Sequence, residues 1–272
     1  TPLRFAVIRR DAARVRELLE QTGTDAEAPL SRDYPDQFRK KGMTILHDAM
    51  FFSTPEIIAL LLDVGKARHD AIDGQGQDAL IWAVTGSNVE AVRFWLKRFP
   101  HWDLTVCDTV VGNNALLWAF YYLDERNGLP IVQLLLNAGA DPNFVANAGG
   151  TILHLAAGSD DSSVGMVKLA LKYQDVNHQF RAKSYFWSCV YWVLKMALRF
   201  GATSHKFVEV FGHSPGMTAL HNAAMFGNSP VVRVLLEAGA DKTLRTDLGL
   251  TALDITRIFG PFPVIEELLG QI

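Results

Sequence analysis

The chain has 272 residues, of which 49% are hydrophobic and 20% charged, and its formal net charge at pH 7 is −3. This is a globular composition, and the small net charge argues against a nucleic-acid surface, which concentrates Lys and Arg against the phosphates. Cys107 and Cys189 lie far apart, which indicates neither a disulfide framework nor a zinc site and fits a reducing compartment. No apolar run approaches the roughly 18 to 20 residues that span a bilayer, so we expect no membrane insertion.

A short motif recurs along the chain. Each copy opens with a residue that caps helices, and aliphatic and small residues follow at helical spacing. The copies begin at Thr1, Thr44, Asp78, Asn114, Thr151, Thr218 and Thr251, so the sequence numbers of successive starts differ by 43, 34, 36, 37, 67 and 33. A second apolar helix is predicted behind each motif, around residues 15–19, 57–62, 92–96, 131–136, 166–170, 231–238 and 264–269.

In the copy at Thr218, the residues that start and end both helices are the easiest to identify. Thr218 caps the first helix, and Ala223 and Ala224 allow a neighbouring helix to approach closely. Pro230 stands near the first turn of the second helix, where its missing N–H costs nothing. Gly239 ends that helix in the left-handed conformation. The product is a helix pair with an apolar side that it cannot bury alone.

This stretch, with its run Thr218-Ala219-Leu220-His221-Asn222-Ala223, resembles an ankyrin repeat, and most of the spacings are close to the period of that family. The resemblance covers nearly the whole chain. It implies an all-α fold, an ankyrin-repeat solenoid of helix-turn-helix repeats that forms one elongated domain over residues 1–272. The gap between Thr151 and Thr218 is close to two periods, which implies a hidden copy and about eight repeats in all.

The hidden sixth copy is predicted to begin at Ser184 and to be degenerate. Residues 194–202 resemble the end of a second helix that arrives about four residues early, so its two helices are expected to be fused or joined by a cramped turn. Long surface loops are predicted over 24–41 and 203–215, and a shorter one over 159–163.

Two matches to catalytic motifs are better explained as turns. Residues 212–216 have the form G-x-S-x-G, but Pro215 lacks the N–H that an oxyanion hole requires. Residues 74–79 fit a loose dinucleotide pattern without the preceding strand. The resemblance assigns His47, His154 and His221 to hydrogen bonds with the backbone of adjoining turns, and the other histidines have no close ligand spacing. We therefore expect neither a metal site nor a cofactor.

Asp48 is a charged residue at a place that is apolar in other copies, next to Phe51 and Phe52. In an aromatic pocket its carboxylate would have a raised pKa and could serve as an acid. An acid that reaches solvent at the edge of a groove is the favoured interpretation.

The family resemblance also predicts a binding surface. In this family the residues seven and eight places after the motif threonine face the concave side, and five of the eight pairs here contain an aromatic residue. Aromatic side chains are common anchors of binding surfaces, although some of these rings are expected to pack inward. The predicted lining residues are Phe51, Phe52, Trp82, Trp118, Tyr121, Tyr122, Trp187, Tyr191, Trp192, Met225 and Phe226.

The leading prediction is a non-enzymatic module inside the cell, in cytoplasm or nucleus, that binds an apolar segment of a partner protein or peptide along an aromatic-lined concave groove. The alternative is a closed pocket for a small hydrophobic molecule, with Asp48 or Tyr121 as the acid or base of a cyclase- or isomerase-type reaction. A targeting subunit of a larger enzyme is a third interpretation.

Overall fold

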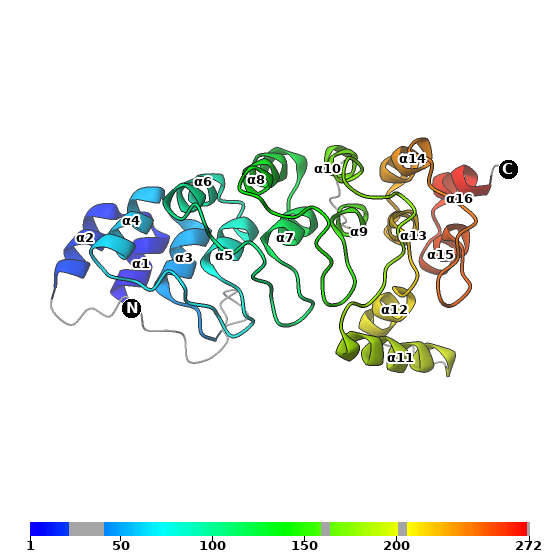
Figure 1. Ribbon diagram of the computed structural model, residues 1–272, viewed down its shortest axis with the longest axis horizontal. Coiled ribbons are helices and arrows are strands. Elements are labelled where there is room, and N and C mark those ends of the chain that lie inside the picture. Colours follow the sequence, from blue (N-terminus) through cyan, green and yellow to red (C-terminus); the bar gives the residue numbers. More distant parts are fainter. Residues whose placement is uncertain (22–40, 159–163, 201–205, 271–272) are drawn as a thin grey trace. The chain divides into compact units, whose positions relative to one another are not determined.

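The computed structural model describes residues 1–21, 41–158, 164–200 and 206–270. Among these residues the regular elements are helices, beside one isolated bridge between Cys107 and Asn114. This confirms the predicted all-α class (Figure 1). The helices are α1 (Pro2–Ile8), α2 (Ala12–Glu20), α3 (Ile45–Phe52), α4 (Pro55–Asp63), α5 (Ala79–Thr85), α6 (Val89–Arg98), α7 (Ala115–Tyr122), α8 (Glu125–Asn137), α9 (Ile152–Ala157), α10 (Val164–Ala170), α11 (Tyr185–Arg199), α12 (Lys206–His213), α13 (Ala219–Met225), α14 (Ser229–Glu237), α15 (Ala252–Phe259) and α16 (Pro263–Gly270).

The predicted capping residues start the first helices. Asp78 Oδ1 accepts a hydrogen bond from the Ile81 N–H at 2.8 Å, and Asn114 Oδ1 accepts one from the Leu117 N–H at 3.0 Å. Thr218 forms a capping box in which a histidine three residues later replaces the usual Glu or Gln. The start of each copy is therefore set by local hydrogen bonds, as the sequence indicates.

The chain divides into two compact units, and the first comprises residues 1–119 and 130–140. In it, α1, α3 and α5 pack side by side in one layer, and α2, α4 and α6 pack in a second (Figure 1). Ala49 and Ala83 are fully buried and keep the first helices close. Gly86 is required for the same reason, because a Cβ there would lie 2.6 Å from the carbonyl oxygen of Phe51.

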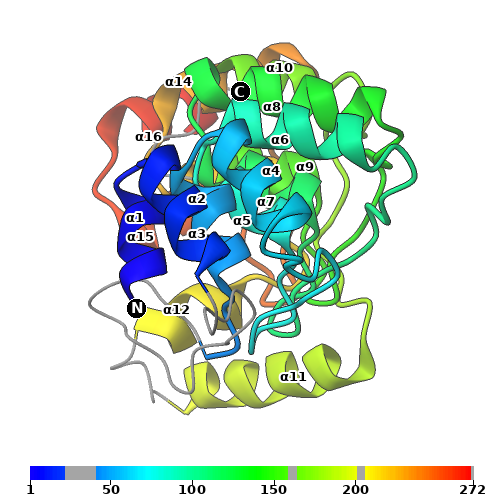
Figure 2. The ribbon, with the colours of Figure 1, turned by 90° about the vertical axis from the view of Figure 1, so that its left-hand side faces the viewer.

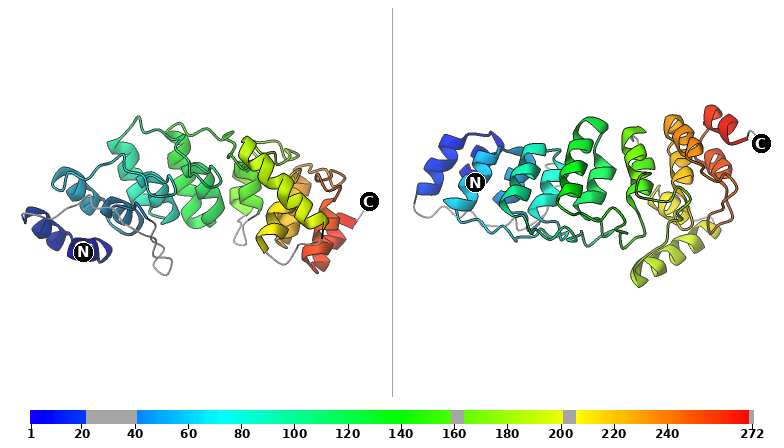
Figure 3. Two further views of the ribbon diagram at one scale, coloured as in Figure 1. Left: turned by 90° about the horizontal axis from the view of Figure 1, so that it is seen from below. Right: turned by 45° about the horizontal axis from the view of Figure 1, so that its top comes forward.

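The second unit comprises residues 120–129 and 141–272, so the boundary between the units passes through α7 and α8. Here α9, α13 and α15 form one layer and α10, α14 and α16 the other (Figure 1). Figure 3 gives two further views of these helices. That residues 1–272 form one domain stays a prediction.

The predicted sixth copy needs correction. Helix α9 packs directly on α13, and α10 packs on α14, so no helix pair of the described residues stands between the fifth and seventh copies. Helices α11 and α12 pack on each other and lie outside both layers of the second unit (Figures 1 and 2). Residues 194–199 continue α11 as one helix, which agrees with the fused alternative, and the loop predicted over 203–215 contains α12.

Hydrogen bonds locate the origin of this helix pair. A fingertip turn, which connects one helix pair to the next, is closed by a bond from an N–H to the carbonyl four residues on, as in Ala146 to Gly150 and Thr246 to Leu250. The corresponding bond here runs from the Phe180 N–H to the Met217 carbonyl at 2.7 Å. Residues 182–214 therefore leave a fingertip turn and return to it, and we call them the excursion. The excursion is as long as one repeat period, which is why the spacing suggests a hidden copy.

The other predicted loops lie outside the described residues. This applies to residues 24–40 of the predicted loop 24–41, and to all of 159–163.

Candidate functional site

Exposure divides the predicted lining residues into two groups. Three are well exposed: Tyr121 at 41%, Tyr122 at 58% and Trp192 at 64%. Four are half-buried: Phe51, Phe52, Trp118 and Phe226. The remaining four, Trp82, Trp187, Tyr191 and Met225, are buried. Because the protein already covers these last rings and the thioether, their burial argues against a direct contact with a partner.

In the first unit, Phe51 and Phe52 lie at the end of α3, with ring centroids 4.5 Å apart. The Phe51 ring contacts the Trp82 ring, with centroids 5.8 Å apart. The Trp82 indole N–H donates to Asp73 Oδ2 at 3.2 Å. The buried indole is thus hydrogen-bonded to a carboxylate and contacted by the Phe51 ring. This places Trp82 in the support of the phenylalanine pair.

In the second unit, Tyr121 and Tyr122 end α7 in an edge-to-face arrangement, with centroids 4.9 Å apart. Phe226 caps the end of α13 and lies beside Gly158, where a Cβ would be 3.5 Å from the ring. Each unit therefore has aromatic residues at the ends of its first helices. That these residues line a binding surface stays a prediction.

Trp187 and Tyr191 have a different role. They lie within the 15-residue helix α11, and their rings contact each other at 5.4 Å. The Tyr191 hydroxyl donates to the Ala148 carbonyl at 3.0 Å, and burial raises the pKa of this phenol. The two rings attach α11 to a fingertip turn, and Trp187 also stacks on Phe211 of α12. The placement of Tyr191 and Trp192 at the end of a short first helix is wrong, because α11 continues for two more turns.

Both interpretations of Asp48 also need correction. Its side chain is fully buried, so it does not reach solvent, and its carboxylate lies 3.3 Å from Arg4 Nε in place of an aromatic pocket. Arg4 is buried too and donates to the Met43 carbonyl at 2.7 Å. An ion-paired carboxylate without access to solvent is poorly placed to act on a ligand. Arg4 was missed by sequence reasoning, although it occupies the histidine place of the first copy.

The three motif histidines have the backbone-bridging role that the resemblance assigns. Their Nε2 atoms contact the carbonyls of the next fingertip turns: His47 with Ala71 at 3.1 Å, His154 with Met217 at 3.2 Å and His221 with Leu250 at 3.2 Å. The Thr44 and Thr218 N–H groups donate to Nδ1, which places the proton of those neutral rings on Nε2. Burial lowers the pKa of His47 and of His154 to about 4, and burial also lowers that of His221.

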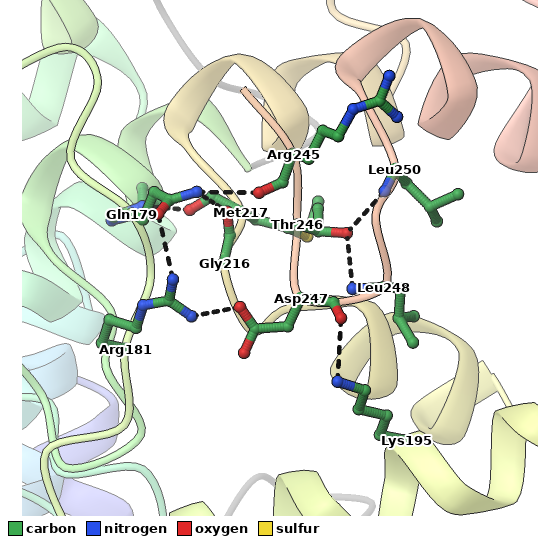
Figure 4. Close-up of polar contacts among 11 residues, drawn as sticks. Gln179, Arg181, Lys195, Gly216, Met217, Arg245, Thr246, Asp247, Leu248 and Leu250 are labelled. Carbon is green, nitrogen blue, oxygen red and sulfur yellow. Dashed lines mark hydrogen bonds and ion pairs between the residues drawn. The ribbon is translucent and has the colours of Figure 1, made fainter. Parts of the chain in front are cut away.

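Fingertip turns of the second unit are joined by polar contacts (Figure 4). Gln179 Nε2 donates to the carbonyls of Gly216 and Arg245 at 3.0 Å each, and Arg181 pairs with the Asp247 carboxylate. Lys195 of α11 donates to the Asp247 carbonyl at 2.9 Å. The contacts of Gln179 and Arg181 join successive fingertip turns, and the contact of Lys195 holds the excursion against the last of them.

The excursion also carries exposed rings that are not among the predicted lining residues. On α11, Tyr185 is 86% exposed and Phe186 67%, and Phe200 directly after the helix is 83% exposed. The sequence identifies this segment as the most apolar of the chain, but that signal alone does not tell a buried helix from an exposed one. Among the described residues, no helix has the length and apolar character to span a membrane. The same part of the chain holds no cluster of His, Cys, Asp and Glu suited to a metal ion.

Comparisons with known proteins agree with this architecture. The family model for ankyrin repeats (3 copies) matches residues 52–143 and 122–246, together more than half of the chain. The mouse (Mus musculus) B-cell lymphoma 3 protein homolog is 32% identical over 161 residues, which cover 58% of this chain and 32% of that protein. The E3 ubiquitin-protein ligase KEG of Arabidopsis thaliana is 22% identical over 89% of this chain and 18% of its own length. The chain thus spans at most about a third of these curated relatives.

Among solved structures, the ankyrin repeat domain of Bcl-3, a member of the IkappaB protein family, is similar with a TM-score of 0.62 and 25% identity. The match covers 100% of this chain and 98% of that one. Ankyrin repeats build solenoid scaffolds whose surfaces bind other proteins. The chain belongs to the ankyrin repeat family.

Proposed function

We propose that the chain recognises a partner protein by binding an apolar segment of it with the aromatic residues at the ends of the first helices. The observation that carries this proposal is the exposed pair Tyr121 and Tyr122 at the end of α7. Tyrosine buries a large area on binding while few torsions are frozen, which makes it a frequent hot spot. The half-buried pair Phe51 and Phe52 gives the first unit a similar feature at the end of α3.

The packing beneath these rings supports the proposal. Phe51 rests on Trp82, which is fixed by Asp73, so its ring is held in place before a partner arrives. Tyr121 and Tyr122 contact each other edge to face. Preorganised anchors lower the entropy cost of association, and surrounding polar residues set specificity. The buried residues Trp187, Tyr191 and Met225 are not part of this proposed surface.

Substitution of the tyrosines tests the proposal. Peptides selected from a displayed random library on the full chain are titrated into the wild type and the double variant Tyr121→Ala/Tyr122→Ala. We expect affinity to fall by at least about tenfold, the usual effect of removing a hot spot. Tyr173→Ala is the matched control, because Tyr173 is 42% exposed but is not at the end of a first helix. Equal affinity of the wild type, this double variant and Phe51→Ala for every selected peptide would contradict the proposal.

A further inference from the structure

Helix α11 has an apolar face that the described residues leave uncovered. Phe186, Cys189, Val190, Val193 and Phe200 recur at spacings of three, four and seven residues, which places them on one side of the helix. The exposed fractions are 67% for Phe186, 56% for Val193 and 83% for Phe200. A helix that is apolar on nearly all sides is normally buried, and a contiguous exposed patch marks an interaction site.

The opposite face fixes the helix in the second unit. The Ser184 N–H donates to the Asn147 carbonyl at 3.2 Å, and the Tyr191 hydroxyl donates to the Ala148 carbonyl. Lys195 donates to the Asp247 carbonyl (Figure 4). Figure 2 shows α11 along its length, with α12 beside it. Since these anchors come from two fingertip turns, the outer face is presented by a rigid element.

The exposed face is hollowed. A shallow, open depression of about 250 Å³ is lined by Phe186, Cys189, Val190, Val193 and Leu194. Sites that enclose small molecules are usually about 300 to 1,000 Å³ and carry several polar groups. A smaller, apolar hollow fits one bulky side chain of a partner better than a small ligand.

Positive charge predominates along α11 and the residues before it, and the first acidic residue after the helix is Glu209 in the sequence of α12. Residues 176–208 contain five Lys or Arg residues and no Asp or Glu. Arg181 and Lys195 are held by Asp247. Lys183, just before α11, has its Nζ over the Phe144 ring, 5.2 Å from the centroid. Neither Lys183 nor Arg199, at the end of α11, forms an ion pair with another described residue. A cation thus lies at each end of the apolar face, and both would favour carboxylates opposite them.

We propose that α11 is a docking site for an acidic amphipathic helix of a partner protein. The apolar side chains of the partner's helix would cover Phe186 and Val193 and fill the hollow on α11. The carboxylates of the partner's helix would face Lys183 and Arg199. A second copy of α11 fits less well, because the same cations would meet across an antiparallel pair. This surface is separate from Tyr121 and Tyr122 and does not depend on the function proposed for them.

Two designed peptides of about five helical turns test the proposal by calorimetry on the full chain. Both carry leucines at positions i, i+3, i+4 and i+7. The first carries glutamates elsewhere and the second lysines. We expect the acidic peptide to bind at least about tenfold more tightly than the basic one. The double variant Phe186→Ala/Val193→Ala should bind the acidic peptide at least about tenfold more weakly than the wild type does, the effect of losing an apolar anchor. Lys183→Glu/Arg199→Glu should reverse the preference.

The controls separate this proposal from its competitors. Tyr173→Ala, and Tyr121→Ala/Tyr122→Ala at the other proposed surface, should leave the affinity for the acidic peptide unchanged. Circular dichroism establishes that each variant is folded. Equal binding of both peptides, or binding unaffected by Phe186→Ala/Val193→Ala, would overturn the proposal. So would preferential binding to phosphatidylserine vesicles, or a dimer in sedimentation that the same double variant abolishes.

Discussion

Arg4 and Asp48 show how a departure from the repeat pattern in one copy is compensated in the next. Arg4 takes the histidine place of the first copy, and Asp48 takes an apolar place of the second. Neither position is explained by its own repeat. The ion pair at 3.3 Å, buried on both sides, joins the two substitutions into one feature. The partner of an unusual charged residue in a stacked repeat should therefore be sought in the neighbouring repeat.

Breaking this pair from one side should destabilise the first unit. Asp48→Ala leaves the Arg4 guanidinium buried without its carboxylate, which costs about 3 to 5 kcal/mol for pairs of this kind. Arg4→Met/Asp48→Leu removes both charges and should recover most of that loss. Urea unfolding of the three proteins measures the difference. A loss below about 1 kcal/mol for Asp48→Ala would place this pair among weak surface ion pairs.

The buried histidines predict lower stability in mild acid. His154 has an ordinary pKa of 6.5 when unfolded and about 4 when folded, because burial disfavours the charged ring. The unfolded state therefore binds more protons below pH 6.5, and stability is lost as the pH falls from 6.5 toward 4. At pH 5 this histidine alone should cost about 2 kcal/mol relative to pH 7. His47 acts in the same sense in the first unit.

A non-titrating variant isolates this contribution. Urea unfolding of the wild type and His154→Gln is compared at pH 7 and pH 5, and the variant should show the smaller decrease by about 2 kcal/mol. The variant is compared with the wild type because Asp78 also changes stability with pH. Burial raises the pKa of Asp78, so Asp78 favours the folded state as the pH falls, and it does so equally in both proteins. An identical pH dependence of the two proteins would contradict the assignment.

At the scale of elements, the sequence predicted what local hydrogen bonds and spacing decide. Thr218, Asp78 and Ser184 cap helices where expected, since capping depends on residues only two or three places away. The exposure of a ring depends on distant neighbours. Trp82 is buried where Phe51 contacts its ring and Asp73 accepts its indole N–H. Nothing in the motif that contains Trp82 distinguishes it from an exposed ring. The sequence therefore predicts which positions belong to the candidate site, but not which of their side chains are exposed.

Fingertip turns of the second unit give a matched pair of glycine tests. Gly149 has φ +108°, and a Cβ there would collide with the Arg181 carbonyl and lie 2.9 Å from the Ala182 N. Gly249 has φ +80°, with open space where its Cβ would stand. Gly249→Ala should cost only the left-handed strain, about 1 kcal/mol. Gly149→Ala adds a clash with backbone that leads into α11, and should cost on the order of 3 kcal/mol.

Thermal unfolding of both alanine variants beside the wild type measures this difference. Equal transition temperatures for Gly149→Ala and Gly249→Ala would mean that the turn at Gly149 does not pack closely on Arg181.

At the scale of the whole molecule, the excursion is the feature that repeat spacing misrepresents. A hidden repeat and a fingertip excursion of equal length give the same distance between motifs. They differ in which helices pack together, a non-local property that the spacing does not contain. The contact of α9 with α13 and the bond from Phe180 to Met217 decide for the excursion. In a solenoid, stability is roughly the sum of repeats and their interfaces, so the excursion should add little to it.

Excision of residues 182–214, which joins Arg181 to Pro215, should therefore leave a folded protein. Phe180 and Met217 then become four positions apart, as Thr246 and Leu250 already are. We expect helical circular dichroism and cooperative unfolding, with binding at Tyr121 and Tyr122 retained and the acidic peptide no longer bound. Excision of residues 190–222, a segment of the same length, cuts through α11 and α13 and should not fold. If both shortened chains unfolded alike, the helix pair would be part of the stack, as the period alone suggests.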